Sequence, residues 1–309
     1  MLEIKNLCKR YGKFNALDNL SLSIDEGEIF GFVGPNGAGK TTAMKIVCGL
    51  LSPTSGKVYI DDSDIIEDVR KAKSKIGYMP DFFGVYDNLK VDEYLQFYAS
   101  IYGIKKAESK KITNELLDLV GLSDKSQEYV DSLSRGMKQR LCFARCLVHN
   151  PRLLVLDEPA SGMDPKSRIE MKDILRTLKD MGKTILVSSH ILSDLAKLCT
   201  TIGIIDHGRI VAQGSVDEIN ARVHGRRTIR IKLKRKTDEA LRLLREFITI
   251  DKVSIEREYI EAGFTGDDNE LRAILERLIT CKIPVITFTQ TEGNLEDIFM
   301  KVIGGANTR

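Results

Sequence analysis

A glycine-rich segment between two apolar runs constrains the fold of this chain more than any other feature. The segment consists of Gly34, Pro35, Asn36, Gly37, Ala38, Gly39, Lys40, Thr41 and Thr42. The run 29–33 before it is typical of a strand, and the run 41–47 after it is typical of a helix that ends at Gly49. A strand, a glycine loop and a helix in this order predict an α/β unit whose loop binds phosphate groups.

The residue types of this loop suit the phosphates of a nucleoside triphosphate. Glycine lets backbone N–H groups curl around phosphate oxygens, because no Cβ stands in the way. The helix that follows adds its N-terminal dipole. Lys40 would supply charge to the β- and γ-phosphates, and the Thr41 hydroxyl is a candidate ligand for Mg²⁺. An ordinary glycine turn is the alternative, and it fits the strand and helix context less well.

A pair of carboxylates follows another apolar strand. Asp157 and Glu158 come directly after the run 153–156. Parallel sheets present ligands at the carboxyl ends of their strands, so we expect Asp157 to hold the metal ion, directly or through water. Glu158 is expected to polarise a water molecule toward the γ-phosphate. A helix N-cap with a solvated neighbour is the alternative, and Pro159 argues against it.

The order of strands and helices predicts two domains. Residues 1–220 are expected to form an α/β P-loop NTPase sheet core with an antiparallel β subdomain near 2–24 and a helical insertion at about 88–150. Residues 221–309 are typical of a small α+β accessory domain with a ferredoxin-like pattern. Its expected elements are strands at 228–234 and 284–289, a hairpin at 252–265, and helices at 237–247, 269–279 and 295–303.

Composition limits the location and the partners. Of the 309 residues, 42% are hydrophobic and 29% are charged, as in ordinary globular proteins. No apolar run approaches the roughly 20 residues of a spanning helix, and the start of the chain is no signal peptide. The six cysteines are scattered, so we expect a cytosolic location with buried, reduced thiols. A net charge of +3 gives no argument for nucleic acid as a partner.

Seven basic residues between positions 226 and 236 form a local exception to this weak charge. Ile229, Ile231 and Leu233 alternate with them, which is the period of a half-buried strand. We interpret the segment as the solvated face of a strand, and a patch that faces a partner or a lipid surface is the alternative.

Ser134 stands at the start of a helix whose apolar positions include Met137, Leu141 and Ala144. It is a suitable N-cap, and Gly136 falls in the first helical turn. A helix N-terminus with a free hydroxyl and free N–H groups binds anions. A plain helix cap without a ligand is the alternative.

These motifs resemble, in type and order, those of the nucleotide-binding subunits of ABC transporters, over residues 1 to about 215. Besides the glycine loop and the carboxylate pair, the matching parts are an aromatic residue, Tyr11, the signature motif at 133–137, the D-loop at 161–164, the switch histidine His190 and the closing segment 208–214. Arg135 stands where the commonest signature motif has glycine.

The resemblance implies that two subunits share each site. Ser134 and Gly136 of one chain would contact the γ-phosphate held by the other, so two chains, expected as a homodimer, would sandwich two ATP molecules. Asp164 would communicate between the two sites. Tyr11 would stack on adenine, and His190 would join Glu158 and Lys40 as the catalytic residues.

The loop after residues 76–80 departs from the family pattern, because Asp81 stands where the family normally has glutamine. A carboxylate is a stronger oxygen ligand for Mg²⁺, but an ionised one donates no hydrogen bond. Asp81 is therefore a further candidate metal ligand. The aromatic residues of the segment 82–86 lie where the family meets its membrane subunit, and burial in the helical insertion is the alternative.

The resemblance identifies an ATP-hydrolysing subunit that powers a membrane ABC transporter, similar to ABC-2-type and drug-exporter ATPases. We expect ATP and Mg²⁺ as cofactors, an integral membrane subunit as partner, no nucleic acid, and a peripheral location at the cytoplasmic face of the cell membrane. A soluble ABC ATPase that acts on nucleic acid or ribosomes is the alternative. A non-hydrolysing subunit is disfavoured, because Lys40, Asp157, Glu158 and His190 are all present.

Overall fold

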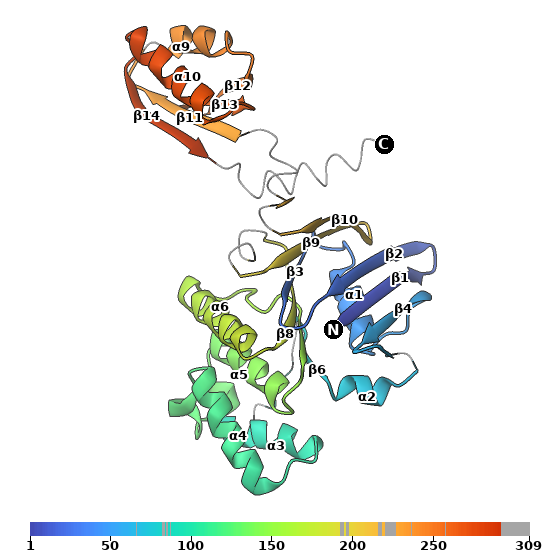
Figure 1. Ribbon diagram of the computed structural model, residues 1–309. Helices are drawn as coiled ribbons and strands as arrows, with labels where there is room; N and C mark the ends of the chain where they lie inside the picture. The colour runs from blue at the N-terminus through green and yellow to red at the C-terminus, as the bar shows by residue number, and fades with distance from the viewer. Residues whose placement is uncertain are drawn as a thin grey trace. The chain divides into compact units, whose positions relative to one another are not determined.

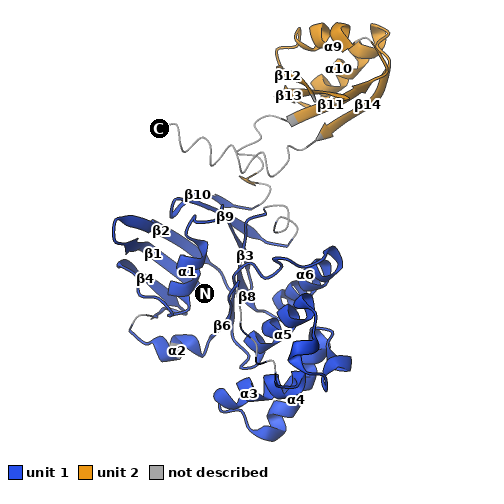
Figure 2. Cartoon of the chain, turned by 180° about the vertical axis from the view of Figure 1, so that it is seen from behind, with its two compact units in different colours: residues 1–216 blue, residues 217–309 orange. Residues whose placement is uncertain are grey.

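The computed structural model describes residues 1–291 except 66, 82–83, 85, 87, 192–194, 196–197, 216–217, 220–226, 236 and 257. The chain divides into two compact units, residues 1–216 and 217–309 (Figure 2). Each unit has its own hydrophobic core.

A six-stranded sheet forms the centre of the first unit. In spatial order its strands are β10 (Arg209–Gly214), β9 (Thr201–Asp206), β3 (Ile29–Val33), β8 (Thr184–Ser189), β7 (Leu153–Leu156) and β6 (Ile76–Met79). All neighbours are parallel except β9 and β10. Every residue of β3, β7 and β8 is buried, which explains their unbroken apolar character. The parallel register brings the carboxyl ends of these strands to one edge.

An antiparallel sheet and a helix complete this core (Figure 1). The sheet runs in the order β2 (Phe14–Ile24), β1 (Leu2–Tyr11), β4 (Ser55–Ile60) and β5 (Ser63–Asp64). Helix α1 (Lys40–Val47) packs with both sheets, because Met44 belongs to the same buried cluster as Leu20 of β2 and Phe32 of β3. The short helix α2 (Val69–Lys73) precedes β6.

Helices fill the segment between β6 and β7, as the expected insertion requires. They are α3 (Val91–Ile101), α4 (Lys106–Leu119) and α5 (Arg135–Leu147), with single 3₁₀ turns at Ser123–Lys125 and Val130–Ser132. Helix α6 (Pro165–Asp180) follows β7 and begins with proline after the cap Asp164. The predicted α/β core with its antiparallel subdomain and helical insertion is confirmed.

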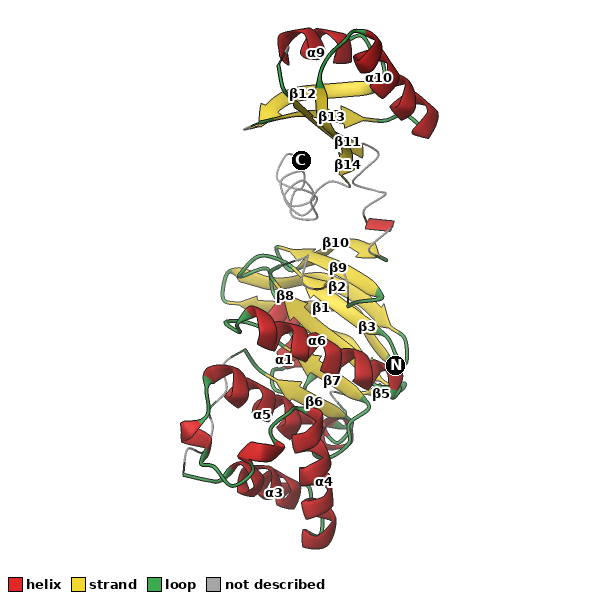
Figure 3. Cartoon of the chain, turned by 90° about the vertical axis from the view of Figure 1, so that its left-hand side faces the viewer, coloured by secondary structure: helices red, strands yellow, loops and turns green. Residues whose placement is uncertain are grey.

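The second unit is a four-stranded antiparallel sheet with two helices. Its elements are β11 (Arg227–Leu233), α9 (Thr237–Leu244), β12 (Ile250–Glu256), β13 (Tyr259–Phe264), α10 (Asp268–Thr280) and β14 (Val285–Thr291). The strand order is β12-β13-β11-β14, and both helices cover one face (Figure 3). The predicted α+β pattern is confirmed, and the helix expected at 295–303 lies outside the described residues.

The basic strand β11 and the cysteines behave in part as expected. Ile229 and Ile231 are buried in the core of the second unit. Arg230 pairs with Glu261 over 2.8 Å and Lys232 pairs with Glu258, so both charges are locally compensated.

All six thiols are free, but the expectation of burial is wrong for Cys281, which is exposed.

Among the described residues, no helix is both long and apolar enough to cross a membrane.

Candidate nucleotide site

The glycine loop follows β3 at the carboxyl edge of the parallel sheet and leads into α1. Gly39 is the residue before α1 and has a φ of 109°, which disfavours any side chain. A Cβ at Gly39 would lie 2.5 Å from the Ala16 carbonyl oxygen, and one at Gly34 would lie 2.5 Å from that of Ile205. Glycine is therefore required at both positions by close contact with neighbouring backbone.

Lys40 turns back into the loop that precedes it. Its Nζ donates to the carbonyl oxygens of Gly34 at 2.6 Å and Pro35 at 3.2 Å. The same ammonium lies 3.8 Å from Oε1 of Glu158. Burial lowers the pKa of Lys40, and the nearby carboxylates Glu158 and Asp157 oppose that shift. The positive charge is thus held at the centre of the loop, where an anion can replace its backbone partners.

Asp157 is a buried carboxylate with one unused oxygen. Its side chain follows β7 and is 1% exposed. Oδ1 accepts a 2.7 Å hydrogen bond from the Ser188 hydroxyl, whereas Oδ2 has no hydrogen-bond partner among the described residues. A buried carboxylate oxygen without a donor suits a cation. Asp157 therefore fits the expected metal role.

A Mg²⁺ ion fits the oxygen ligands that this site offers. Mg²⁺ commonly binds one or two carboxylates together with substrate phosphates and water, and it does not need a full protein cage. Thr41 lines the nucleotide cavity in the first turn of α1. Within the described part of the chain, no cluster of three or more His, Cys, Asp or Glu side chains offers a closed metal cage.

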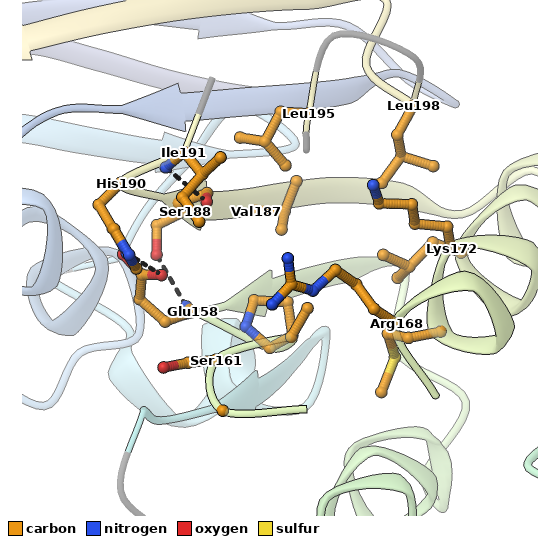
Figure 4. Close-up of a pocket in the computed structure, with 16 residues that line it drawn as sticks. Glu158, Ser161, Arg168, Lys172, Val187, Ser188, His190, Ile191, Leu195 and Leu198 are labelled. Carbon is orange, nitrogen blue, oxygen red and sulfur yellow. Dashed lines mark hydrogen bonds and ion pairs between the residues drawn. The ribbon is translucent and has the colours of Figure 1, made fainter. Parts of the chain in front are cut away.

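Glu158 and His190 form a hydrogen-bonded pair beside the loop (Figure 4). Oε2 of Glu158 lies 2.9 Å from Nδ1 of His190, and the Glu158 N–H donates to the Ser188 hydroxyl over 2.9 Å. Glu158 has a φ of 51°, which is strained for a residue with a side chain. Its Oε1 is buried and makes no hydrogen bond with the described residues, and Nζ of Lys40 lies 3.8 Å from it.

Ser188 is a residue that the motifs above do not single out. Its hydroxyl donates to Asp157 and accepts from Glu158, so one side chain positions both carboxylates. The only signal in the sequence is a hydroxyl inside the apolar run of β8.

The nucleotide cavity has a volume of about 250 Å³ and is lined by both charged and aromatic side chains. Lys40, Asp81 and Glu158 supply the charged groups and Tyr11 and Phe14 the aromatic rings, together with Ala16 and most of the glycine loop. Tyr11 is 49% exposed and Phe14 is 61% exposed, and the two pair directly across β1 and β2. Phe14 is a second aromatic residue that the sequence motifs do not reveal.

Asp81 follows β6 and lies close to the other charged groups. Burial and the nearby Asp157 carboxylate raise its pKa, while Arg135, His190 and Lys40 oppose the shift. Asp81 therefore lines the nucleotide cavity, at the position where the family normally has glutamine.

The residues expected to act on a second subunit do not line this cavity. Ser134 caps α5, and its hydroxyl accepts from the Met137 N–H over 3.3 Å. Asp164 caps α6 by accepting from the N–H groups of Lys166 and Ser167, and the Ser167 hydrogen bonds lower the pKa of Asp164. Within one chain, Ser134 and Asp164 thus act as helix N-caps. Their contact with a second subunit stays a prediction.

Glu158 and His190 also line one side of a second cavity, of about 180 Å³ (Figure 4). Leu175, Val187 and Leu195 give it mainly apolar walls, and Arg168 and Lys172 extend into it from α6.

Two family models match the chain. The model described as ABC transporter matches residues 17–161, and the model of the C-terminal domain of DrrA1-3-like ATP-binding proteins matches residues 214–303.

Curated relatives align with almost the whole chain. The linearmycin resistance ATP-binding protein LnrL of Bacillus subtilis is 31% identical over 98% of both chains. The bacitracin transport ATP-binding protein BcrA of Bacillus licheniformis is 34% identical over 99% of this chain and 98% of its own.

Solved structures match the first unit. An ATP-binding subunit of an ABC transporter has a TM-score of 0.66 at 30% identity and covers 72% of this chain and 92% of its own. A dimeric ATP-binding cassette in a post-hydrolysis state with ADP and Pi has a TM-score of 0.64 at 27% identity and covers 70% of this chain and 99% of its own. The chain belongs to the family of ABC transporter ATP-binding proteins, and it is an ATPase of that family.

Proposed function

We propose that this ATPase drives an exporter of antibiotic-like or other drug-like molecules through a separate integral membrane subunit. The observation that carries the hydrolytic part is the clustering of Lys40, Asp157 and His190 around Glu158: Lys40 and His190 both contact Glu158, and the adjacent Asp157 has an unused oxygen. Lys40 and Glu158 also line the nucleotide cavity. The export part rests on relatives named for linearmycin resistance and bacitracin transport.

The nucleotide would occupy this cavity, with its base at the aromatic side chains and its phosphates at the glycine loop and Lys40. Tyr11 and Phe14 would stack on the base, and the N–H groups of residues 34–42 would surround the phosphates. Lys40 would exchange its carbonyl partners for phosphate oxygens. Thr41, Asp157 and, as a further candidate, Asp81 would hold Mg²⁺. When bound, Mg²⁺ neutralises phosphate charge and orients the triphosphate.

Glu158 would take the proton from the attacking water. Its Oε1 has no hydrogen bond to give up, while Oε2 is held by His190. The Ser188 hydroxyl fixes the Glu158 backbone, so the carboxylate is positioned before a substrate arrives. His190 would also contact the γ-phosphate, since its side chain is partly exposed beside Glu158.

A second copy of the chain would complete the site. Ser134 and Gly136 would reach the γ-phosphate held by the other subunit, and Asp164 would lie at the contact between subunits. The dimeric cassette with ADP and Pi supports this arrangement by analogy. So does the position of Ser134 and Gly136 outside the nucleotide cavity of their own chain.

An exposed aromatic surface on and beside α3 is the proposed docking surface for a cytoplasmic segment of the membrane subunit. Its members are Leu50, Tyr86, Phe97, Ile101 and Tyr102, each at least 40% exposed. Tyr86 packs edge-on against Phe97, with ring centroids 5.4 Å apart. A solvent-facing group of this kind favours a partner over burial within the chain. Phe82, Phe83 and Val85, which belong to the expected surface, lie outside the described residues.

Co-purification in detergent tests this function. The full chain should be retained with an integral membrane protein, and it should peripherally associate with the cytoplasmic face of the membrane. Retention on nucleic acid that falls steeply with salt would instead support a soluble ATPase acting on nucleic acid. The pairing of Arg230 and Lys232 with glutamates gives that alternative little support.

A further inference from the structure

The first turn of α5 lies directly on the D-loop of the same chain. A Cβ built on Gly162 would lie 2.6 Å from Cζ of Arg135, 2.7 Å from Nη2 and 2.9 Å from Nη1. Three atoms of the guanidinium at nearly equal distances mean that its flat face covers the glycine. Gly162 has a φ of 69°, so backbone conformation and close contact both favour glycine there.

One helical turn further along, α5 also binds Pro159, which lies just before the D-loop. The buried side chain of Gln139 donates from Nε2 to the Pro159 carbonyl oxygen over 2.6 Å. Positions 135 and 139 lie on one face of a helix, because they are four residues apart. Pro159 directly follows Glu158, so this hydrogen bond ends one residue from the proposed general base.

The first turn of α5 also lies close to Ser167, a residue that is bonded to Asp164 of the D-loop. A Cβ on Gly136 would meet the Ser167 hydroxyl oxygen at 3.4 Å. That hydroxyl donates to Oδ2 of Asp164 over 2.6 Å. Helix α5 therefore binds Pro159 through Gln139, has Arg135 over Gly162, and brings Gly136 close to Ser167, whose hydroxyl is hydrogen-bonded to Asp164.

We propose that Arg135 and Gln139 are positioning residues that couple the two ATP sites of a dimer. The inference rests on the proposed function, in which Ser134 and Gly136 contact the nucleotide of the partner subunit. A shift of α5 caused by that contact would be passed through Arg135 to Gly162 and through Gln139 to Pro159. It would thereby reposition Glu158 in its own subunit, so that each site responds to nucleotide at the other.

The chemistry of the Arg135 contact makes this role specific. A planar guanidinium can lie flat on a glycine, whereas a lysine ammonium cannot. Glycine at position 135, as in the commonest signature motif, would leave the D-loop without this cover. The contact thus depends on the arginine that replaces the glycine of the commonest motif.

Arg135→Ala in the full-length protein is the first test. We expect ATP affinity of the Glu158→Gln form to change by less than about 2-fold, because Arg135 does not line the nucleotide cavity. We expect steady-state hydrolysis to fall by about 10-fold to 100-fold and the Hill coefficient for ATP to fall toward one. Arg135→Lys should behave like Arg135→Ala. The matched control is Arg176→Ala, which removes an exposed arginine on α6 that pairs with Asp173.

The reciprocal change comes from the loop side. Gly162→Ala should displace the Arg135 guanidinium and cause the same loss of cooperativity as Arg135→Ala. The double variant Arg135→Ala/Gly162→Ala should lose no more cooperativity than either single variant, because both changes remove the same contact. Gln139→Met keeps the side-chain length without the donor and should also reduce cooperativity while binding ATP normally.

Two outcomes are distinguishable. An unchanged Hill coefficient and hydrolysis rate in Arg135→Ala, with a wild-type protein that hydrolyses ATP cooperatively, would overturn the coupling role alone. A wild-type chain that binds ATP but neither hydrolyses it nor dimerises would instead overturn the proposed function.

Discussion

The Ser188 hydroxyl joins Asp157 and Glu158, because it donates to the first side chain over 2.7 Å and accepts from the backbone N–H of the second over 2.9 Å. One buried group on β8 thus sets the position of the proposed metal ligand and of the proposed general base. The two functions at the end of β7 are coupled through the neighbouring strand.

Glu158→Gln is expected to separate ATP binding from hydrolysis. The amide retains the size of the side chain but is a far weaker base, so single-turnover hydrolysis should slow by about 10²–10⁴-fold while ATP affinity persists. ATP-bound dimers should accumulate and elute earlier in size-exclusion chromatography. Normal single-turnover hydrolysis in this variant would contradict the assignment of Glu158.

Ser188→Ala is expected to reduce both stability and hydrolysis. It leaves Asp157 Oδ1 and the Glu158 N–H without their hydrogen-bond partner, and such a loss costs about 1–3 kcal/mol of the free energy of unfolding. Chemical denaturation and hydrolysis rates provide the measurements. Ser100→Ala is the control, because its exposed hydroxyl donates to the Phe97 carbonyl within α3, away from the site. Equal free energies of unfolding for the two variants would show that the hydrogen bonds of Ser188 contribute little to stability.

Asp81→Asn should change how stability depends on pH. The pKa of Asp81 is raised above its usual 3.8, chiefly by burial and then by Asp157. The folded protein therefore binds more protons than the unfolded chain between the two pKa values, and stability falls as pH rises through that interval. The Asp81→Asn variant has no titratable group at this position, so its stability does not fall for this reason as pH rises.

The unfolding temperature of Asp81→Asn relative to wild type should therefore increase as pH rises through the mildly acidic range, in protein without nucleotide or metal. Asp180→Asn, at an exposed position at the end of α6, is the control and should show no such trend. A pH-independent difference between Asp81→Asn and wild type would show that the Asp81 charge is not destabilising.

Tyr11→Ala and Phe14→Ala should each weaken ATP binding. An aromatic stacking partner of a base contributes about 1–3 kcal/mol, so the dissociation constant should rise by roughly 5-fold to 150-fold. Binding of inorganic triphosphate, which has no base, should remain unchanged and is measured by the same calorimetric titration. If Phe14→Ala binds ATP like wild type, Tyr11 alone forms the base site.

Local patterns predict the parts of the site that lie within one stretch of chain. The glycine loop, Lys40, Asp157 and Glu158 are recognisable because their chemistry depends on neighbours a few residues away. The fold class follows from the same alternation of strands and helices, and the family comparison supports it.

The remaining residues depend on contacts between distant segments. Ser188 meets the carboxylates only because Leu156 pairs with Val187 in the parallel sheet. Phe14 joins the cavity only because the hairpin register places it opposite Tyr11. Arg135 is visible in the sequence as a departure from a motif, but its contact with Gly162 requires the packing of α5 on the D-loop. A motif confined to one stretch of sequence does not show which residues of distant strands and helices become its neighbours.

The sheet of the second unit begins and ends along the same pair of strands. Thr228, at the start of β11, pairs with Thr291, at the end of β14. The two points where the polypeptide crosses into and out of residues 227–291 are therefore neighbours, as in folds that tolerate transplantation. A foreign antiparallel domain with similarly adjacent termini would span the same short gap, which makes residues 227–291 a natural segment to exchange when the ATPase is engineered.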